Sequence, residues 1–280
     1  MRRILVLLPT ALLALGACQD RPTEPAGVAP SASRGASSNT NVVHVVYLVP
    51  SDRAVQKRSE KALTRAIESL QIWYRNALGT GESFSLAKPI VQVYTTAHSA
   101  SRYATQPNDC GPALFFWCNV LDEGFALTHG SFSDAHNIWI FYIDADPGCG
   151  QATGGAAGVA LLPANDLRGI SGAATVDVCT GAPQPDQGVD RWVGGLGHEL
   201  GHAFGLPHPP DCDPVQLPSC PVQAIMWFGY LTYPDAFLTD SEKTFLEESP
   251  FFSALHLPAR LPNVGRPVAY ELPAAENGAH

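Results

Sequence analysis

The chain has 280 residues, of which 45% are hydrophobic and 15% are charged, and its formal net charge is −9 at neutral pH. This length and hydrophobic content are sufficient to bury a sizeable core, which excludes a disordered or fibrous protein. The acidic balance argues against nucleic acid as a partner, because phosphate backbones are bound by basic surfaces.

Residues 1–17 have the pattern of a targeting segment. Arg2 and Arg3 precede an apolar run that is short for a membrane span, which is typical of a secretory signal. The end of this run, LGAC, resembles the lipobox of bacterial lipoproteins and implies cleavage before Cys18 with lipid attached to its sulfur. The protein would then be anchored at the outer membrane or cell surface. The alternative is a plain signal peptide with an incidental Cys18, which would give a secreted protein.

Residues 18–40 are rich in Pro, Ala and Ser and predict a flexible tether. We expect one folded domain over 41–280, a monomer, and contact with the membrane through the lipid anchor only.

Six of the seven cysteines follow position 18, and an even number in an exported chain predicts disulfides. Proximity in the sequence suggests pairing Cys110 with Cys118 and Cys212 with Cys220, which leaves Cys149 with Cys179. A zinc site with cysteine ligands is the alternative, but the chain lacks the closely spaced C-x-x-C pairs that such a site needs.

Strand and helix patterns alternate along the chain. Strands are predicted at Val42–Val49, Ile90–Thr95, Asn137–Asp144, Gly158–Leu162 and Ala174–Val178. Helices are predicted from Asp52 to about Leu78, where Gly79 ends the run, at Asp190–Phe204, and from a capping box at Thr239 to about Glu248. This order predicts a mixed α/β sheet.

The stretch GHELGHAFGLPH, which begins at residue 197, concentrates histidine in a histidine-poor chain. On a helix, His198 and His202 leave the same face one turn apart, as chelation of one ion requires. Gly205 can adopt the left-handed conformation that ends a helix, and Pro207 disfavours helical geometry at the residue before it. The chain can therefore turn there and bring His208 back toward the other two.

Three neutral imidazoles suit zinc and leave its fourth position for a water. Glu199 follows the first ligand and can take a proton from that water. A structural zinc site is the alternative, but such sites usually close the fourth position with a protein ligand. The pattern predicts one catalytic Zn²⁺ ion and hydrolysis of a carbonyl compound.

The motif H-E-x-x-H-x-x-G-x-x-H, followed by AIMWF at residues 224–228, resembles the signature of metzincin metalloendopeptidases with their methionine turn. The resemblance implies a twisted mixed five-stranded sheet with a backing helix and an active-site helix. It implies an upper subdomain over about 41–205, a lower one over about 206–260 that contains a terminal helix, and a tail over 261–280. Met226 would form an apolar floor under the zinc; an ordinary core residue is the alternative.

The resemblance also implies how a peptide would bind. Metzincins pair extended substrate with an antiparallel edge strand, and Gly158, Val159 and Ala160 are the candidates here. In some branches a tyrosine follows the methionine by two residues and contacts the zinc site, but Phe228 holds that position in this chain. Tyr230 would have to replace it, or else Tyr233, unless both are packed aromatics.

Two further expectations concern the loops. By resemblance, the strands that end near Asp144 and Val178 would lie parallel and adjacent, which would place Cys149 beside Cys179. Asp144 and Asp146 precede a Pro-Gly turn, so a calcium site is left open beside the simpler interpretation as turn residues.

The sequence thus predicts a zinc-dependent endopeptidase that hydrolyses extracellular or periplasmic proteins. The alternative is a zinc-containing surface lipoprotein that binds peptides or glycoproteins without turnover.

Overall fold

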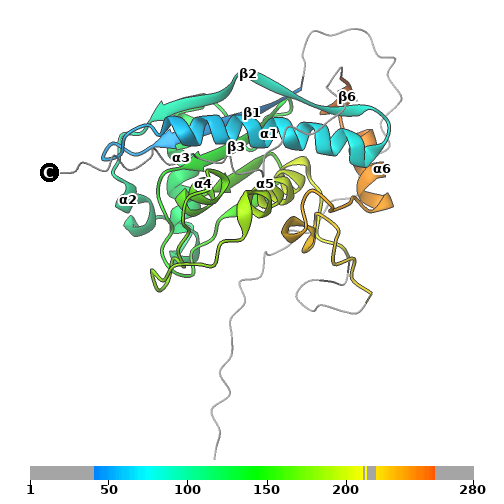
Figure 1. The fold of residues 1–280 in the computed structure, drawn as a ribbon. Coiled ribbons are helices and arrows are strands. Elements are labelled where there is room, and N and C mark those ends of the chain that lie inside the picture. Colours follow the sequence, from blue (N-terminus) through cyan, green and yellow to red (C-terminus); the bar gives the residue numbers. More distant parts are fainter. Residues whose placement is uncertain (1–40, 211, 213–218, 256–280) are drawn as a thin grey trace, which may run out of the picture. The chain divides into compact units, whose positions relative to one another are not determined.

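The computed structural model describes residues 41–210, 212 and 219–255 (Figure 1). The predicted signal segment, Cys18, the tether and the tail at 261–280 lie outside the described residues. The expected segment and subdomain boundaries remain predictions.

A six-stranded sheet forms the centre, in the order β4-β5-β3-β1-β2-β6. The strands are β1 (Val42–Val49), β2 (Glu82–Thr95), β3 (Asn137–Ile143), β4 (Gly154–Ala156), β5 (Val159–Leu162) and β6 (Phe252–Ala254). The four inner strands run parallel, and both outer strands are antiparallel to their neighbours. The predicted fold class, a mixed α/β sheet, is confirmed.

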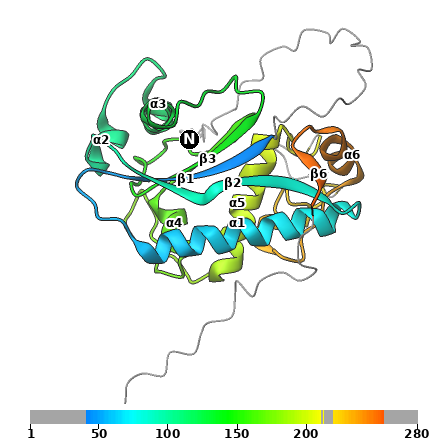
Figure 2. The ribbon, with the colours of Figure 1, turned by 90° about the horizontal axis from the view of Figure 1, so that it is seen from above.

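Helices cover both faces of this sheet (Figure 2). They are α1 (Lys57–Leu78), α2 (Ala100–Thr105), α3 (Phe115–Thr128), α4 (Ala164–Ile170), α5 (Gly188–Phe204) and α6 (Asp240–Glu248), with short 3-10 turns at Pro112–Leu114 and Gly229–Leu231. One apolar core lies between the sheet and α1, α4 and α5, and a second lies between the sheet and α2 and α3.

Strand β3 shows how the sheet separates these cores. Ile140 and Tyr142 belong to the first core and Phe141 and Ile143 to the second, because successive side chains of a strand point to opposite faces. A strand buried on both faces reads as a continuous apolar run. This is why β1 and β3 were recognisable in the sequence.

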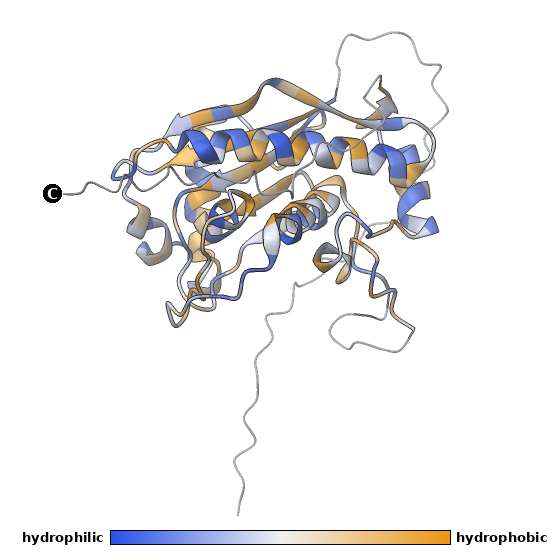
Figure 3. Cartoon of the chain, viewed as in Figure 1, coloured by the Kyte–Doolittle hydropathy of each residue, from blue (hydrophilic) through white to orange (hydrophobic). Residues whose placement is uncertain are grey.

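Helix α1 is amphipathic, with hydrophilic and hydrophobic residues distributed along its whole length (Figure 3). It ends as predicted at Gly79, whose φ is 78° and whose N–H donates to the carbonyl of Arg75. It begins at Lys57 rather than Asp52. The Asp52 carboxylate instead accepts a hydrogen bond from the N–H of Ala100 at 2.8 Å.

The predicted strand at Ala174–Val178 is wrong. Only Val176 forms an isolated bridge, to Pro183. The carboxylate of Asp177 accepts hydrogen bonds from the N–H groups of Cys179 and Thr180 at 3.1 and 2.8 Å, which stabilises a turn that competes with strand pairing.

Strand β2 is longer than predicted, since it begins at Glu82. Five elements were not predicted from the sequence: β4, β6, α2, α3 and α4. The capping box at Thr239 and the helix that follows it are confirmed.

All three predicted disulfides are present, joining Cys110 to Cys118, Cys149 to Cys179 and Cys212 to Cys220. The second joins two loops, since the strand expected before Cys179 does not form. Such crosslinks are typical of proteins that mature in an oxidising compartment. Among the described residues, none of the helices combines the length and the apolar character that crossing a bilayer requires.

Candidate metal centre

The candidate site is built on α5, a helix unusually rich in glycine. Glycine in a helix interior costs about 1 kcal/mol relative to alanine, so propensity alone does not explain this helix. Gly194, Gly197 and Gly201 recur at helical spacing and allow close approach of other parts of the chain. A Cβ atom at position 197 would lie 2.8 Å from Leu70 Cδ2 on α1, and one at position 194 would collide with the carbonyl of Tyr230.

Met226 packs against Gly201, the last of these glycines, whose missing side chain leaves a notch in the helix surface. A Cβ atom at position 201 would collide with the Met226 sulfur, and the methionine side chain is fully buried. Gly201 lies one residue before His202, so the methionine packs directly against the ligand-bearing turn. The prediction of Met226 as an apolar support is consistent with this position.

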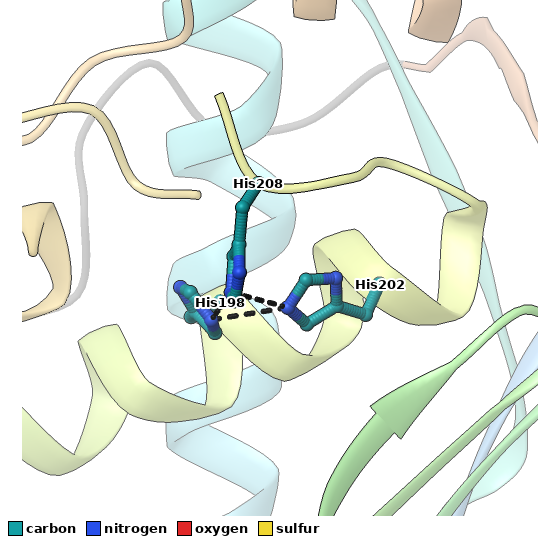
Figure 4. A group of neighbouring side chains, drawn as sticks. All are labelled: His198, His202 and His208. Atoms are coloured by element: carbon teal, nitrogen blue, oxygen red, sulfur yellow. Dashed lines mark hydrogen bonds between the residues drawn. The ribbon is translucent and has the colours of Figure 1, made fainter. Parts of the chain in front are cut away.

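Helix α5 ends where the sequence predicted. Gly205 has a φ of 101°, and its N–H and that of Leu206 donate to carbonyls of the last helical turn, at His202 and Gly201. This left-handed cap turns the chain sharply. It brings His208 back over the helix to face His198 and His202 (Figure 4).

The three histidines converge through their Nε2 atoms. The distances are 3.1 Å between His198 and His202, 3.1 Å between His202 and His208, and 3.3 Å between His208 and His198. A tetrahedral zinc with Zn–N bonds of about 2.1 Å separates its nitrogens by about 3.4 Å. The triangle therefore has the size that one ion requires.

The opposite ring nitrogens identify the tautomers. Nδ1 of His198 lies 2.7 Å from the carbonyl oxygen of Ile225, and Nδ1 of His202 lies 2.8 Å from that of Leu206. Each Nδ1 must donate, so in the neutral ring each Nε2 has only a lone pair to present. Two such lone pairs facing each other at 3.1 Å repel unless a cation lies between them. The residues thus fit a metal ion.

Burial keeps the rings of His198 and His202 neutral, as metal binding needs. Desolvation lowers the pKa of His198 to about 3, and the neighbouring His202 adds to this shift. The pKa of His202 is also lowered, mainly by its burial.

Glu199 lines the same cavity as His198. Burial raises the pKa of its carboxyl to about 8, the charge of Asp166 adds to this, and a hydrogen bond from the backbone N–H of Gly155 opposes it. A bound cation would also favour the carboxylate. The carboxyl group thus lines the cavity beside His198 and is held by the N–H of Gly155.

Strand β4 supplies that N–H because it packs against α5 without side chains between them. A Cβ atom at position 154 would lie 3.1 Å from Glu199 Oε2, and one at position 155 would lie 2.7 Å from His202 Cβ. The two glycines therefore permit the contact between the sheet and α5.

The assignment of Gly158, Val159 and Ala160 to an edge strand is wrong. Strand β5, which contains the latter two, pairs with β3 on one side and β4 on the other. Gly158 has a φ of 89°, and its N–H donates to the carbonyl of Ala203 at the end of α5. The antiparallel edge strand beside the site is β4, whose Gly-Gly-Ala sequence has no alternating pattern.

The aromatic residues after Met226 occupy different places. The ring of Tyr230 lies 5.5 Å from that of His198 and lines the cavity. Tyr233 points into the core, where its hydroxyl lies 2.7 Å from Ser69 Oγ. Trp227 packs 5.6 Å from the ring of His208. Of the two tyrosines, only Tyr230 lies near the metal centre.

Three polar residues of the cavity were not predicted from the sequence: Thr153, Asp166 and Arg191. Burial raises the pKa of Asp166 to about 6, and the charge of Arg191 opposes that shift. No motif signalled these residues, since they come from a loop and two helices. The open calcium site gains no support, because Asp146 is held by Arg168 at 2.9 Å.

Comparisons with known proteins support the fold. No family model matches the sequence, and neither does any curated protein. The structure is similar to that of catalytically inactive OgpA from Akkermansia muciniphila in complex with an O-glycopeptide substrate, glycodrosocin. The two are 20% identical with a TM-score of 0.50, and the match covers 79% of this chain and 64% of that one.

Two other matches are more distant. Archaemetzincin from Methanopyrus kandleri is 15% identical, with a TM-score of 0.40 and coverage of 75% of this chain and 95% of that one. A zinc-dependent peptidase from Methanocorpusculum labreanum is 14% identical, with a TM-score of 0.30 and coverage of 72% and 99%. This chain matches less than two thirds of the OgpA chain. The likeness to OgpA shows a shared fold.

Proposed function

We propose that the protein is an exported, zinc-dependent endopeptidase of metzincin type. The observation that carries the proposal is the triangle of Nε2 atoms, 3.1 to 3.3 Å apart, formed by His198, His202 and His208. Glu199 lines the same cavity and is not one of the three ligands. Three ligands beside a carboxyl group are typical of a catalytic zinc site.

A bound zinc ion supplies Lewis-acid chemistry: it polarises a carbonyl and lowers the pKa of water. Glu199 takes the proton of the attacking water and passes it to the leaving amine. The N–H of Gly155 holds the carboxylate in place for both transfers. Tyr230, whose ring lies 5.5 Å from that of His198, is the candidate donor to the oxygen on which negative charge develops.

Strand β4 is the surface that best suits an extended peptide. It is the outer strand of the sheet on the side of α5, and a peptide can add to its free edge through backbone hydrogen bonds. Because OgpA was solved with an O-glycopeptide, substrates of this class belong in any assay beside unmodified peptides. Lipid attachment at Cys18 remains part of the proposal.

The test combines metal analysis with cleavage assays on unfolded proteins, a mixed peptide library and O-glycopeptides. The wild-type protein should hold about one zinc per chain and cleave within peptides. Glu199→Gln should keep the zinc and lose about 10²- to 10⁴-fold in rate, because it removes the proton acceptor and no ligand.

The matched control is Glu247→Gln, an exposed glutamate on α6, which should keep both zinc and activity. A Glu199→Gln protein that holds zinc and cleaves at nearly the wild-type rate would refute the role of the carboxylate. Wild-type protein that holds zinc and binds peptides without cleaving any of them would favour the alternative, a zinc-containing binding protein.

A further inference from the structure

A polar cavity of about 290 Å³ opens beside His198, and the proposed chemistry uses only part of its lining. Its walls are formed by Thr153, Asp166, Arg191, Gly195, His198, Glu199 and Tyr230. The side chains that bear on catalysis are His198, Glu199 and Tyr230. The rest of the lining is available for another purpose.

Arg191 is the fixed cation of this cavity. It precedes His198 by seven residues, about two helical turns, so both side chains leave the same face of α5. Its guanidinium carbon lies 4.2 Å from the ring centre of Trp192 and 5.1 Å from that of Tyr230. Its Nε donates to Gln187 Oε1 at 2.9 Å. Stacking and this bond together hold the planar group in one orientation.

The free end of the guanidinium faces the cavity. A Cβ atom at position 195 would lie 2.9 Å from Nη1 of Arg191, so the absence of a side chain at Gly195 makes room for it. The ion pairs among the described residues are Lys57 with Glu60 and Arg168 with Asp146. Arg191 therefore has no ion pair there, although it is oriented and partly buried.

Asp166 provides a carboxylate on another wall. It comes from α4, in a separate part of the chain, and it also lines the cavity without an ion pair among the described residues. Asp166 and Arg191 carry opposite charges and line the same cavity. A group entering the cavity meets a rigid donor from α5, an acceptor from α4 and the hydroxyl of Thr153.

We propose that this cavity selects a neutral substrate group with both hydrogen-bond donor and acceptor atoms, beside the scissile bond. This inference rests on the peptidase function proposed above. The group is an amide, as in Asn and Gln, or a hydroxyl, as in Ser and Thr. Its acceptor faces Arg191 and its donor faces Asp166.

Other side-chain classes fit this lining less well. A carboxylate would meet Asp166 and an ammonium would meet Arg191, so either would face a like charge on one wall. An apolar side chain would displace water from both charged groups without replacing the lost hydrogen bonds, which is costly. The lining therefore discriminates against acidic, basic and apolar side chains.

The experiment uses short peptides that differ at a single position next to the cleaved bond, with Gln, Asn, Ser, Thr, Glu, Lys or Leu there. Cleavage by the zinc-loaded wild-type protein gives kcat and KM for each peptide. Calorimetric titration into zinc-loaded Glu199→Gln protein gives Kd without turnover. Arg191→Met and Asp166→Leu are made in both backgrounds, and Arg65→Met, an exposed arginine on α1, is the matched control.

We expect the amide or the hydroxyl peptides to bind about tenfold or more tightly than those with Glu, Lys and Leu. Comparing the Gln and Asn peptides with the Ser and Thr peptides shows whether the cavity prefers an amide or a hydroxyl. Arg191→Met should remove the preference, mainly through KM, and shift it toward Leu. Arg65→Met should leave the preference unchanged.

A wild-type preference for Leu, Glu or Lys would overturn the inference while leaving the peptidase function intact. So would an Arg191→Met variant that slows cleavage of every peptide equally, because that result indicates a structural role. If no peptide is cleaved but the Glu199→Gln protein prefers amide or hydroxyl peptides, the proposed function fails and the selectivity stands.

Discussion

Helices α1 and α5 lie on the same face of the sheet, yet their sequences form helices for different reasons. Helix α1 contains no glycine, has one polar and one apolar face, and ends at a glycine cap. Helix α5 has five glycines in seventeen residues, and eleven of its residues are buried. Local propensity suffices to explain α1, whereas α5 depends on what packs against it. The metal centre lies on the helix that depends on its neighbours.

The sharpest test of this contrast is removal of a metal ligand from α5. His202→Ala should abolish detectable peptidase activity and lower zinc occupancy, because two imidazoles bind the ion more weakly than three. Wild-type protein should be more stable than the variant by about 4 kcal/mol when free zinc is 1,000 times its dissociation constant, and the difference should shrink in the presence of a chelator. Metal analysis and thermal unfolding measure both effects.

The control for this variant is His98→Ala, in the loop between β2 and α2. It should keep zinc, stability in zinc and activity. A His202→Ala protein with full zinc content would contradict the assignment of the ligands.

The second test places an alanine in the glycine-rich helix α5 and a glycine in the glycine-free helix α1. Gly201→Ala improves local helix propensity, but its new methyl group collides with the Met226 sulfur. We expect a loss of about 1 to 3 kcal/mol in the free energy of unfolding, because overpacking outweighs propensity. Lys61→Gly, at an exposed position of α1, should cost about 1 kcal/mol through propensity alone.

Urea denaturation of the metal-free proteins measures both changes. If Gly201→Ala is more stable than the wild type, the close contact between α5 and Met226 does not determine the stability of this helix.

A third and smaller effect concerns pH. In the metal-free protein the pKa of Glu199 is about 8, well above its ordinary value of 4.5. Between these values the folded state keeps a proton that the unfolded state releases, so this group lowers the free energy of unfolding as pH rises. Metal-free Glu199→Gln should therefore be more stable than metal-free wild type at pH 6, by about 2 kcal/mol.

This advantage should disappear as pH falls toward 4.5, which thermal unfolding across the pH range can show. Glu247→Gln serves again as the control and should follow the wild-type curve. An advantage that grew toward acid pH would mean that the buried carboxyl of Glu199 has a lowered pKa instead.

Sequence patterns predicted the parts of the structure that local rules determine. Strand β1 is one long apolar run, and the three histidines follow from helix periodicity and a glycine cap. The strand expected at Ala174–Val178 failed because the Asp177 side chain stabilises a turn. Strand β4 was not predicted because its residues, Gly-Gly-Ala, have too little side chain to give an alternating hydrophobic pattern.

The cavity could not be predicted because tertiary structure assembles it. Thr153, Asp166 and Arg191 lie on a loop, α4 and α5, and no spacing rule joins them. The glycine spacing of α5 was visible in the sequence. It indicated close packing of the helix but did not identify the neighbour.

The notch at Gly201 has a consequence for how the chain can change over generations. A mutation that adds a side chain at this position is harmful while Met226 is present, and a smaller residue at position 226 leaves a hole while Gly201 is present. Each single step is disfavoured, although a paired exchange of volume between the two positions could be tolerated. We therefore expect relatives of this protein to differ at these two positions together or at neither, so that the pair would covary in an alignment.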